Sequence, residues 1–140
     1  MRLNESPEPA HDPADFLCAA AGGTLIQHVG GHNSFNHLIE TSNGQSFIMP
    51  GDHHQMMYPY DVEHELLAWV PNKISTEFLP KDTPESNAMY EGKYKEPEAV
   101  WFPKIKGLAI QGHPEWRASL EAVSWCEQMI KEYCLVKTPV

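Results

Sequence analysis

The stretch LAIQGHPEW, residues 108–116, places a histidine and a glutamate directly after an apolar run. The imidazole of His113 can take up or release a proton near neutral pH, so it has the chemistry of a general base. The carboxylate of Glu115 can accept a hydrogen bond from the other ring nitrogen and fix the tautomer. These two residues are therefore candidates for proton transfer in catalysis. A structural alternative is that the triplet HPE ends a strand and begins a helix, with Glu115 favourable near the helix N-terminus.

A cysteine is the candidate nucleophile that a His-Glu pair of this kind would assist. Cys18, Cys126 and Cys134 are an odd number and lack CxxC spacing. This pattern favours buried thiols in a reducing compartment over a disulfide framework, and it predicts a cytoplasmic protein.

Three other histidines are candidates for metal ligands. His28, His32 and His37 with Glu40 would place imidazoles and a carboxylate on neighbouring strands, in the manner of a metal-binding barrel. A glycine turn separates His28 from His37, and none of the spacings is diagnostic. We therefore expect no metal site and no other cofactor.

Length and charge limit the classes of protein that fit the chain. A chain of 140 residues with 41% hydrophobic content is enough for one domain with a core. Its net charge of −9, with only 10 lysines and arginines, argues against binding to nucleic acid or to an anionic membrane surface. The first residues lack the features of a secretory signal, and no apolar run has the length needed to span a bilayer.

The chain is predicted to have a loose tail at residues 1–13 and a single domain at residues 14–140. The tail is rich in proline and acidic residues. A short helix is expected from Pro13, because proline suits a first turn and Gly22 and Gly23 supply a stop.

Short apolar, β-branched segments then predict a strand-rich middle. The turn SNGQ, at 42–45, should join two of them as a hairpin. HELLAWVP and ISTEFLP read as a further pair, each ending at a proline. The expected strands lie within residues 24–29, 35–41, 45–51, 64–71 and 74–80.

The C-terminal third is predicted to contain a loop, a buried strand and a helix. Residues 81–98 are polar and read as a loop long enough to be a lid or an insertion. Residues 108–110 read as a buried strand, and residues 115–134 as a helix lying on a sheet. The apolar stripe of that helix is expected at Trp116, Leu120, Val123, Ile130 and Cys134. The layout is typical of an α/β or α+β domain.

Three segments in the same order resemble class I glutamine amidotransferases, above all the branch of the γ-glutamyl-γ-aminobutyrate hydrolases. GLAIQGHPEW, at 107–116, looks like the strand carrying the catalytic His and Glu of that family. AAAGGTLIQHV, at 19–29, looks like the end of the helix after the nucleophile elbow and the strand that follows it. PGDHHQ, at 50–55, looks like the family's His-His-Gln segment. The resemblance spans residues 14–135, the C-terminal portion of the family's domain.

This resemblance implies a partial flavodoxin-like α/β sandwich and a Cys-His-Glu mechanism acting on glutamine or another γ-glutamyl amide. His113 and Glu115 take the second and third catalytic roles. His53, His54 and Gln55 would line the substrate side of the cleft, although hydrogen bonding within a loop explains the two histidines equally well.

The nucleophile that the resemblance requires is not found. Its place falls near His11, where the sequence AHDPAD has neither a cysteine nor an elbow glycine. Cys18 lies about two helical turns further on, roughly 10 Å along the axis, which is too far to replace it.

Two functions therefore remain open. The first is an amidotransferase-like domain without its own nucleophile, inactive alone and acting through a protein partner or self-association as a homo-oligomer. The alternative is part of a working glutamine amidotransferase or γ-glutamyl hydrolase whose cysteine comes from another chain.

Overall fold

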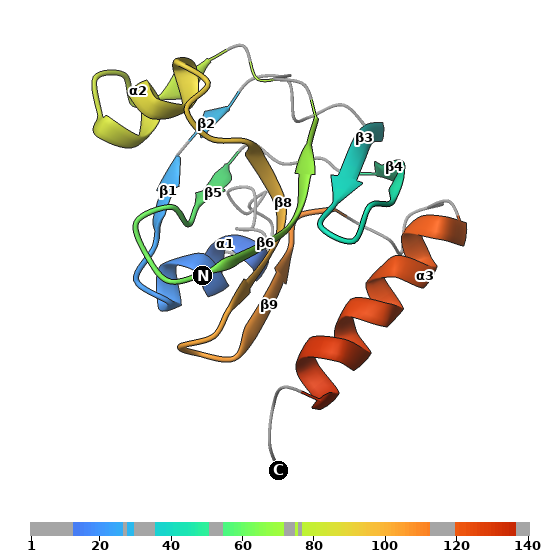
Figure 1. Cartoon of the computed structure of the whole chain (residues 1–140). Coiled ribbons are helices and arrows are strands. Elements are labelled where there is room, and N and C mark those ends of the chain that lie inside the picture. The colour runs from blue at the N-terminus through green and yellow to red at the C-terminus, as the bar shows by residue number, and fades with distance from the viewer. Residues whose placement is uncertain are drawn as a thin grey trace, which may run out of the picture.

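The computed structural model describes residues 13–26, 28–29, 36–50, 55–71, 75, 77–112 and 120–136. Five strands form the main sheet in the order β4-β3-β6-β8-β9, and this sheet curls strongly into a half-barrel (Figure 1). Two small two-stranded sheets, β1-β5 and β2-β7, lie beside it. The elements are α1 (Pro13–Ala20), β1 (Thr24–Ile26), β2 (His28–Val29), β3 (Asn36–Thr41), β4 (Ser46–Pro50), β5 (Met56–Tyr58), β6 (Glu65–Val70), β7 (Phe78–Leu79), α2 (Pro84–Tyr90), β8 (Glu96–Phe102), β9 (Gly107–Ile110), α3 (Leu120–Met129) and the π-helical turn η1 (Ile130–Val136).

The predicted flavodoxin-like sandwich is wrong, because that fold needs a parallel sheet. Every strand pair among the described residues is antiparallel. Parallel neighbours require a crossover of a dozen or more residues, usually a helix. Here β9 follows β8 after only the tight turn 103–106, in which Lys106 has a φ of 51°. The strand predicted at 108–110 is confirmed as part of β9, but it returns antiparallel along β8 at the edge of the sheet.

The predicted hairpin is confirmed over the described residues 36–50. β3 and β4 pair antiparallel, with Leu38 opposite Ile48. The turn works because Gly44 adopts a φ of 85°, a conformation that glycine reaches without a steric penalty. The hydroxyl of Thr41 also accepts a hydrogen bond from the backbone N–H of Gln45 at 3.0 Å.

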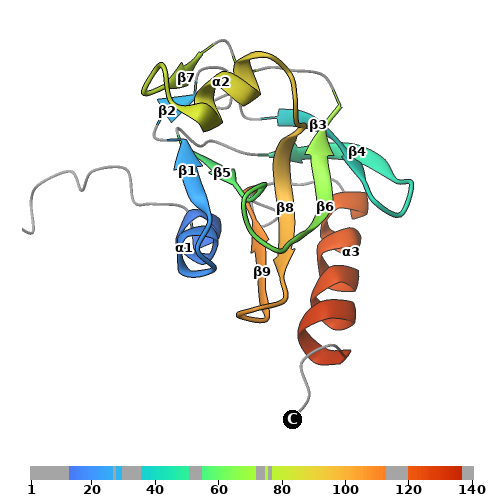
Figure 2. The same ribbon diagram turned by 60° about the vertical axis from the view of Figure 1, so that its left-hand side comes forward.

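Alternate residues of the central strand β8 point to two different layers. Ala99 and Trp101 belong to the cluster packed under α3, whereas Val100 and Phe102 belong to the cluster packed under α1. Figure 2 shows α1 and α3 on opposite sides of β8 and β9. The central strand β8 is therefore covered on both faces, which explains why all seven of its residues are buried.

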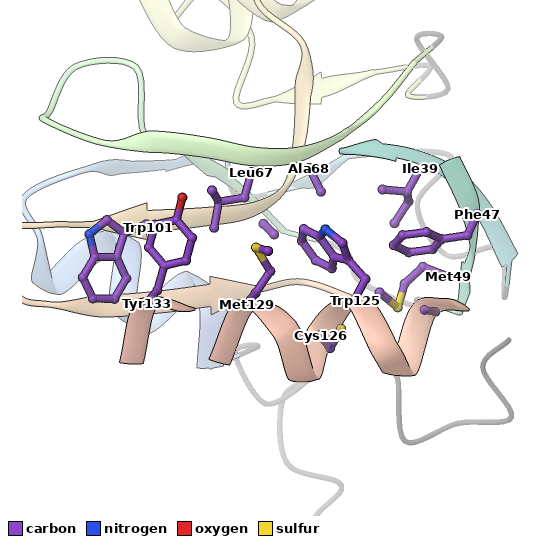
Figure 3. Close-up of a cluster of buried hydrophobic side chains, with 12 residues drawn as sticks. Ile39, Phe47, Met49, Leu67, Ala68, Trp101, Trp125, Cys126, Met129 and Tyr133 are labelled. Atoms are coloured by element: carbon purple, nitrogen blue, oxygen red, sulfur yellow. The ribbon is translucent and has the colours of Figure 1, made fainter. Parts of the chain in front are cut away.

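The terminal helix was predicted in the right region, but its buried face was predicted only in part: Cys134 packs against the core cluster, whereas Leu120 and Ile130 do not, and Trp116 lies outside the described residues. The described helix begins at Leu120, and its side chains facing the sheet include Trp125, Met129 and Tyr133 (Figure 3). Leu120 is 79% exposed and Ile130 is 46% exposed, so the predicted stripe lies partly on the outer surface. The buried face of the helix contains small and polarisable residues such as Ala122 and Cys126. The sequence analysis did not assign these two residues to the apolar stripe.

Two expectations for the middle of the chain are also wrong. β6 and β7 do not pair with each other, since β6 lies between β3 and β8 and β7 pairs with β2. The region 81–98, predicted as a loop, contains α2 and the start of β8. The signal for α2 was the pair Thr83 and Pro84: the Thr83 hydroxyl caps the helix by accepting from the N–H of Ser86 at 3.2 Å, and Pro84 occupies the first turn.

Within the described residues no helix has the length and apolar character required to cross a membrane.

Candidate functional site

The side chain of Gln111 joins three elements at the end of β9. Its Oε1 accepts a hydrogen bond from the backbone N–H of Met57 at 3.2 Å, and its Nε2 donates to Oδ1 of Asp15 at 3.4 Å. The backbone N–H of Gln111 also donates to the carbonyl oxygen of Glu98 at 2.8 Å. Because Met57 is in β5 and Asp15 in the first turn of α1, one buried amide fixes both elements against the end of β9.

The next residue, Gly112, brings the end of β4 to the same place. A Cβ atom at Gly112 would lie 2.3 Å from Cγ of Met49 and 3.3 Å from the carbonyl oxygen of Pro50. Only glycine therefore allows the chain to leave β9 this close to β4.

These contacts place the described ends of four chain segments near one another. Pro13 begins α1, Pro50 ends β4, Gln55 precedes β5 and Gly112 follows β9. The motif PGDHHQ runs between the second and third of these ends, and HPE follows the fourth. The described part of the chain thus brings together the points where both motifs attach to the fold.

Of the predicted site residues, only Gln55 lies in the described part of the chain, where it is half-buried. His53, His54, His113 and Glu115 lie outside the described residues. Their proximity and their roles therefore stay predictions, and the geometry above concerns only the flanking residues.

The site also contains buried polar residues that the sequence analysis did not single out. Asp15, Glu98 and Gln111 are each at most 1% exposed. Glu98 has the same parity along β8 as Val100 and Phe102, so it points to the α1 side of the sheet. The sequence contains only a weak signal that Gln111 is buried. Gln111 follows an apolar strand and has the same parity as buried Ala109, but the sequence does not show which side of that strand is covered.

Cys18 is not placed to act as a nucleophile. It is fully buried, and its Sγ donates to the carbonyl oxygen of Thr24 at 3.4 Å. Burial, which penalises the thiolate, raises the pKa of Cys18 to about 12, although the backbone N–H of Tyr58 acts in the opposite direction. The side chain is a neutral thiol at physiological pH, as expected for a cysteine packed under the sheet.

The other two cysteines lie outside the site, and neither forms a disulfide. Cys126 is buried in the core between α3 and the sheet, and Cys134 is half-buried on η1. The part of the chain that the structure describes contains no group of three His, Cys, Asp or Glu side chains arranged to hold a metal ion. The side chains of His28, His32 and His37 lie outside that part.

Comparisons with protein-family models, with curated proteins and with solved structures found no match. The resemblance to glutamine amidotransferases therefore rests on the three sequence motifs and on nothing else.

Proposed function

We propose that this chain is an amidotransferase-like binding domain that has no thiol nucleophile of its own and acts through self-association or a protein partner. The observation that carries the proposal is the state of Cys18: buried, hydrogen-bonded and neutral, with its pKa raised to about 12. A cysteine nucleophile works as a thiolate that its substrate can reach. Neither condition is met by the cysteine nearest to the site.

Exposed apolar side chains support the binding role. Leu120, Ile130 and Leu135 are exposed on α3 and η1, while the opposite side of these elements packs against the sheet. Large apolar side chains left exposed along one helical segment are available for contact with another protein. We assign this surface to self-association, in which a second copy of the chain presents the same apolar side chains. The chain's net charge of −9 disfavours a nucleic-acid or anionic-membrane partner.

Light scattering over a dilution series tests the self-association. The wild-type chain should have a concentration-dependent mass, and Leu120→Glu and Ile130→Glu should each shift it toward the monomer. Leu38→Glu is the matched control, since Leu38 has the same exposure as Ile130, 46%, but lies on β3. A wild-type chain that remains monomeric at every concentration would contradict the self-association.

The absence of activity in the isolated chain is tested by glutamate release from glutamine. Wild type and His113→Ala should give the same background, since general-base groups without a nucleophile leave a reaction many orders of magnitude slower. Release that depends on His113 would show that the isolated chain is an enzyme, and a Cys18→Ala variant would then tell whether Cys18 is responsible.

A second function, half of a split glutamine amidotransferase or γ-glutamyl hydrolase, is favoured by one specific observation. The hydrogen bonds of Gln111 bring the flanks of PGDHHQ and HPE together with the start of α1, where the resemblance would place the nucleophile. Co-expression with the protein encoded directly upstream tests this reading. Glutamine hydrolysis that appears only with both chains, and that His113→Ala abolishes, would establish the split enzyme in place of the binding domain.

A further inference from the structure

A cavity of about 400 Å³ lies between β7, the turn after it and α2. Among the described residues its lining comes from residues 77–90, and it shares none of them with the site around Gln111. Its volume falls in the range that small-molecule sites occupy. Figures 1 and 2 show α2 beside the small β2-β7 sheet, away from α3.

The cavity is lined by charged groups of both signs. Lys81 contributes an ammonium group, and Glu77 and Asp82 contribute carboxylates. A ligand with two negative groups would meet the two carboxylates, and a ligand with two positive groups would meet Lys81. A ligand carrying one group of each sign matches the lining, because each of its charges finds an opposite charge.

Ser86 supplies an independent sign of a ligand. It lines the cavity and is only 3% exposed, yet its hydroxyl has no hydrogen-bond partner among the described residues. Its backbone N–H is already satisfied by the Thr83 cap, so the hydroxyl is the group left over. A buried hydroxyl without a partner costs about 1–3 kcal/mol, which is the kind of cost that a bound polar group removes.

The remaining lining residues fit a small polar molecule with a short non-polar part. Asn87 adds an exposed amide, Phe78 adds a buried ring, and the ring of Tyr90 is 68% exposed at the cavity. A cavity of this kind has polar groups to orient a ligand and apolar surface to cover its carbon atoms.

We infer that this cavity binds a small zwitterion, an α-amino acid or a short peptide. The ligand's carboxylate pairs with Lys81, and its ammonium group pairs with Glu77 and Asp82. The Ser86 hydroxyl makes a hydrogen bond to the ligand. This site is independent of the proposed self-association and of any amidotransferase chemistry.

The test is an NMR titration of the full chain with L-alanyl-L-alanine, followed through the backbone amides of residues 77–90. Succinate and putrescine serve as matched ligands with two negative or two positive groups. We expect saturable shifts confined to this segment with the dipeptide at millimolar concentration, and weaker binding of both matched ligands.

Two variants and two controls connect the binding to named groups. Lys81→Gln and Ser86→Ala should each weaken binding by about tenfold, the effect of losing a hydrogen bond or ion pair to a charged ligand. Lys104→Gln in the β8–β9 turn and Ser124→Ala on α3 make the same chemical changes at exposed positions outside the cavity and should leave affinity unchanged.

The Ser86→Ala variant also separates a ligand role from a structural one. Removing a hydroxyl without a partner and introducing a better helix former should keep or raise the melting temperature while affinity falls. The inference is overturned if the dipeptide produces no saturable shift, if succinate or putrescine binds as well, or if both variants bind like the wild type.

Discussion

On the side of the sheet covered by α3, Trp125 packs on Phe47 and Tyr133 packs on Trp101, in a mainly apolar cluster that also includes Ile39 and Met129 (Figure 3). On the side covered by α1, the apolar cluster is smaller and adjoins three buried polar side chains. These are Asp15, Glu98 and Gln111.

The two sides therefore differ in what burial achieves. Apolar burial stabilises a fold without regard to direction, at about 25 cal/mol per Å². A buried carboxylate or amide adds little net stability and is costly when a partner is lost, but it fixes its neighbours in one arrangement. The α3 side therefore mainly stabilises the domain, and the α1 side positions the chain segments that carry the motifs.

The largest expected effect is on the α3 side. Trp125→Ala should lower the free energy of unfolding by about 3–5 kcal/mol, because it removes a side chain that is 1% exposed and packs on Phe47 with ring centroids 5.8 Å apart. Trp125→Phe should cost much less, since the indole N–H has no hydrogen-bond partner among the described residues. Urea denaturation of the two variants measures both values. Equal losses would show that the indole N–H matters more than the packing.

On the α1 side, Gln111→Leu should destabilise the domain by about 1–3 kcal/mol, because the Met57 N–H and the Asp15 carboxylate each lose a partner. Asp15→Leu combined with Gln111→Leu should cost less than the sum of the single changes, since both members of the Asp15–Gln111 pair are then apolar. Urea denaturation of the two single variants and the double variant measures this coupling. Strictly additive losses would argue that Gln111 does not link α1 to β9.

Local features of the fold could be predicted from the sequence, whereas long-range features could not. The β3–β4 hairpin was predictable because the turn SNGQ contains the glycine that the turn requires. The direction of β9 was not, since a buried apolar run looks the same whether its neighbour is parallel or antiparallel. The tight turn 103–106 is what makes β9 antiparallel to β8. Its Lys106 adopts a φ of 51°, but lysine is not a residue type that indicates such a turn.

The candidate site shows the same limit. His113 and Glu115 were selected by residue type and spacing, and the sequence also predicted that Cys18 would be buried. Gln111 was passed over although it lies in the same stretch, because its role depends on Asp15 and Met57, which are distant in the chain. Long-range partners of a buried amide leave no local pattern.

The smallest expected effect concerns the thiol under α1. The pKa of Cys18 rises from an ordinary value of 9.0 to about 12 in the folded chain, so the unfolded chain loses its thiol proton first as the pH rises. Stability from this group is present below about pH 9 and is lost progressively toward pH 12. Between pH 9 and 10 the wild type should therefore lose about 1 kcal/mol more of its unfolding free energy than Cys18→Ala. Urea titrations of both proteins at the two pH values measure this difference, in which the tyrosines common to both cancel. Parallel behaviour of the two proteins, or rapid alkylation of Cys18 by iodoacetamide in the native chain at pH 7, would mean that this thiol is accessible as a thiolate, and the α1 side would then contain a nucleophile.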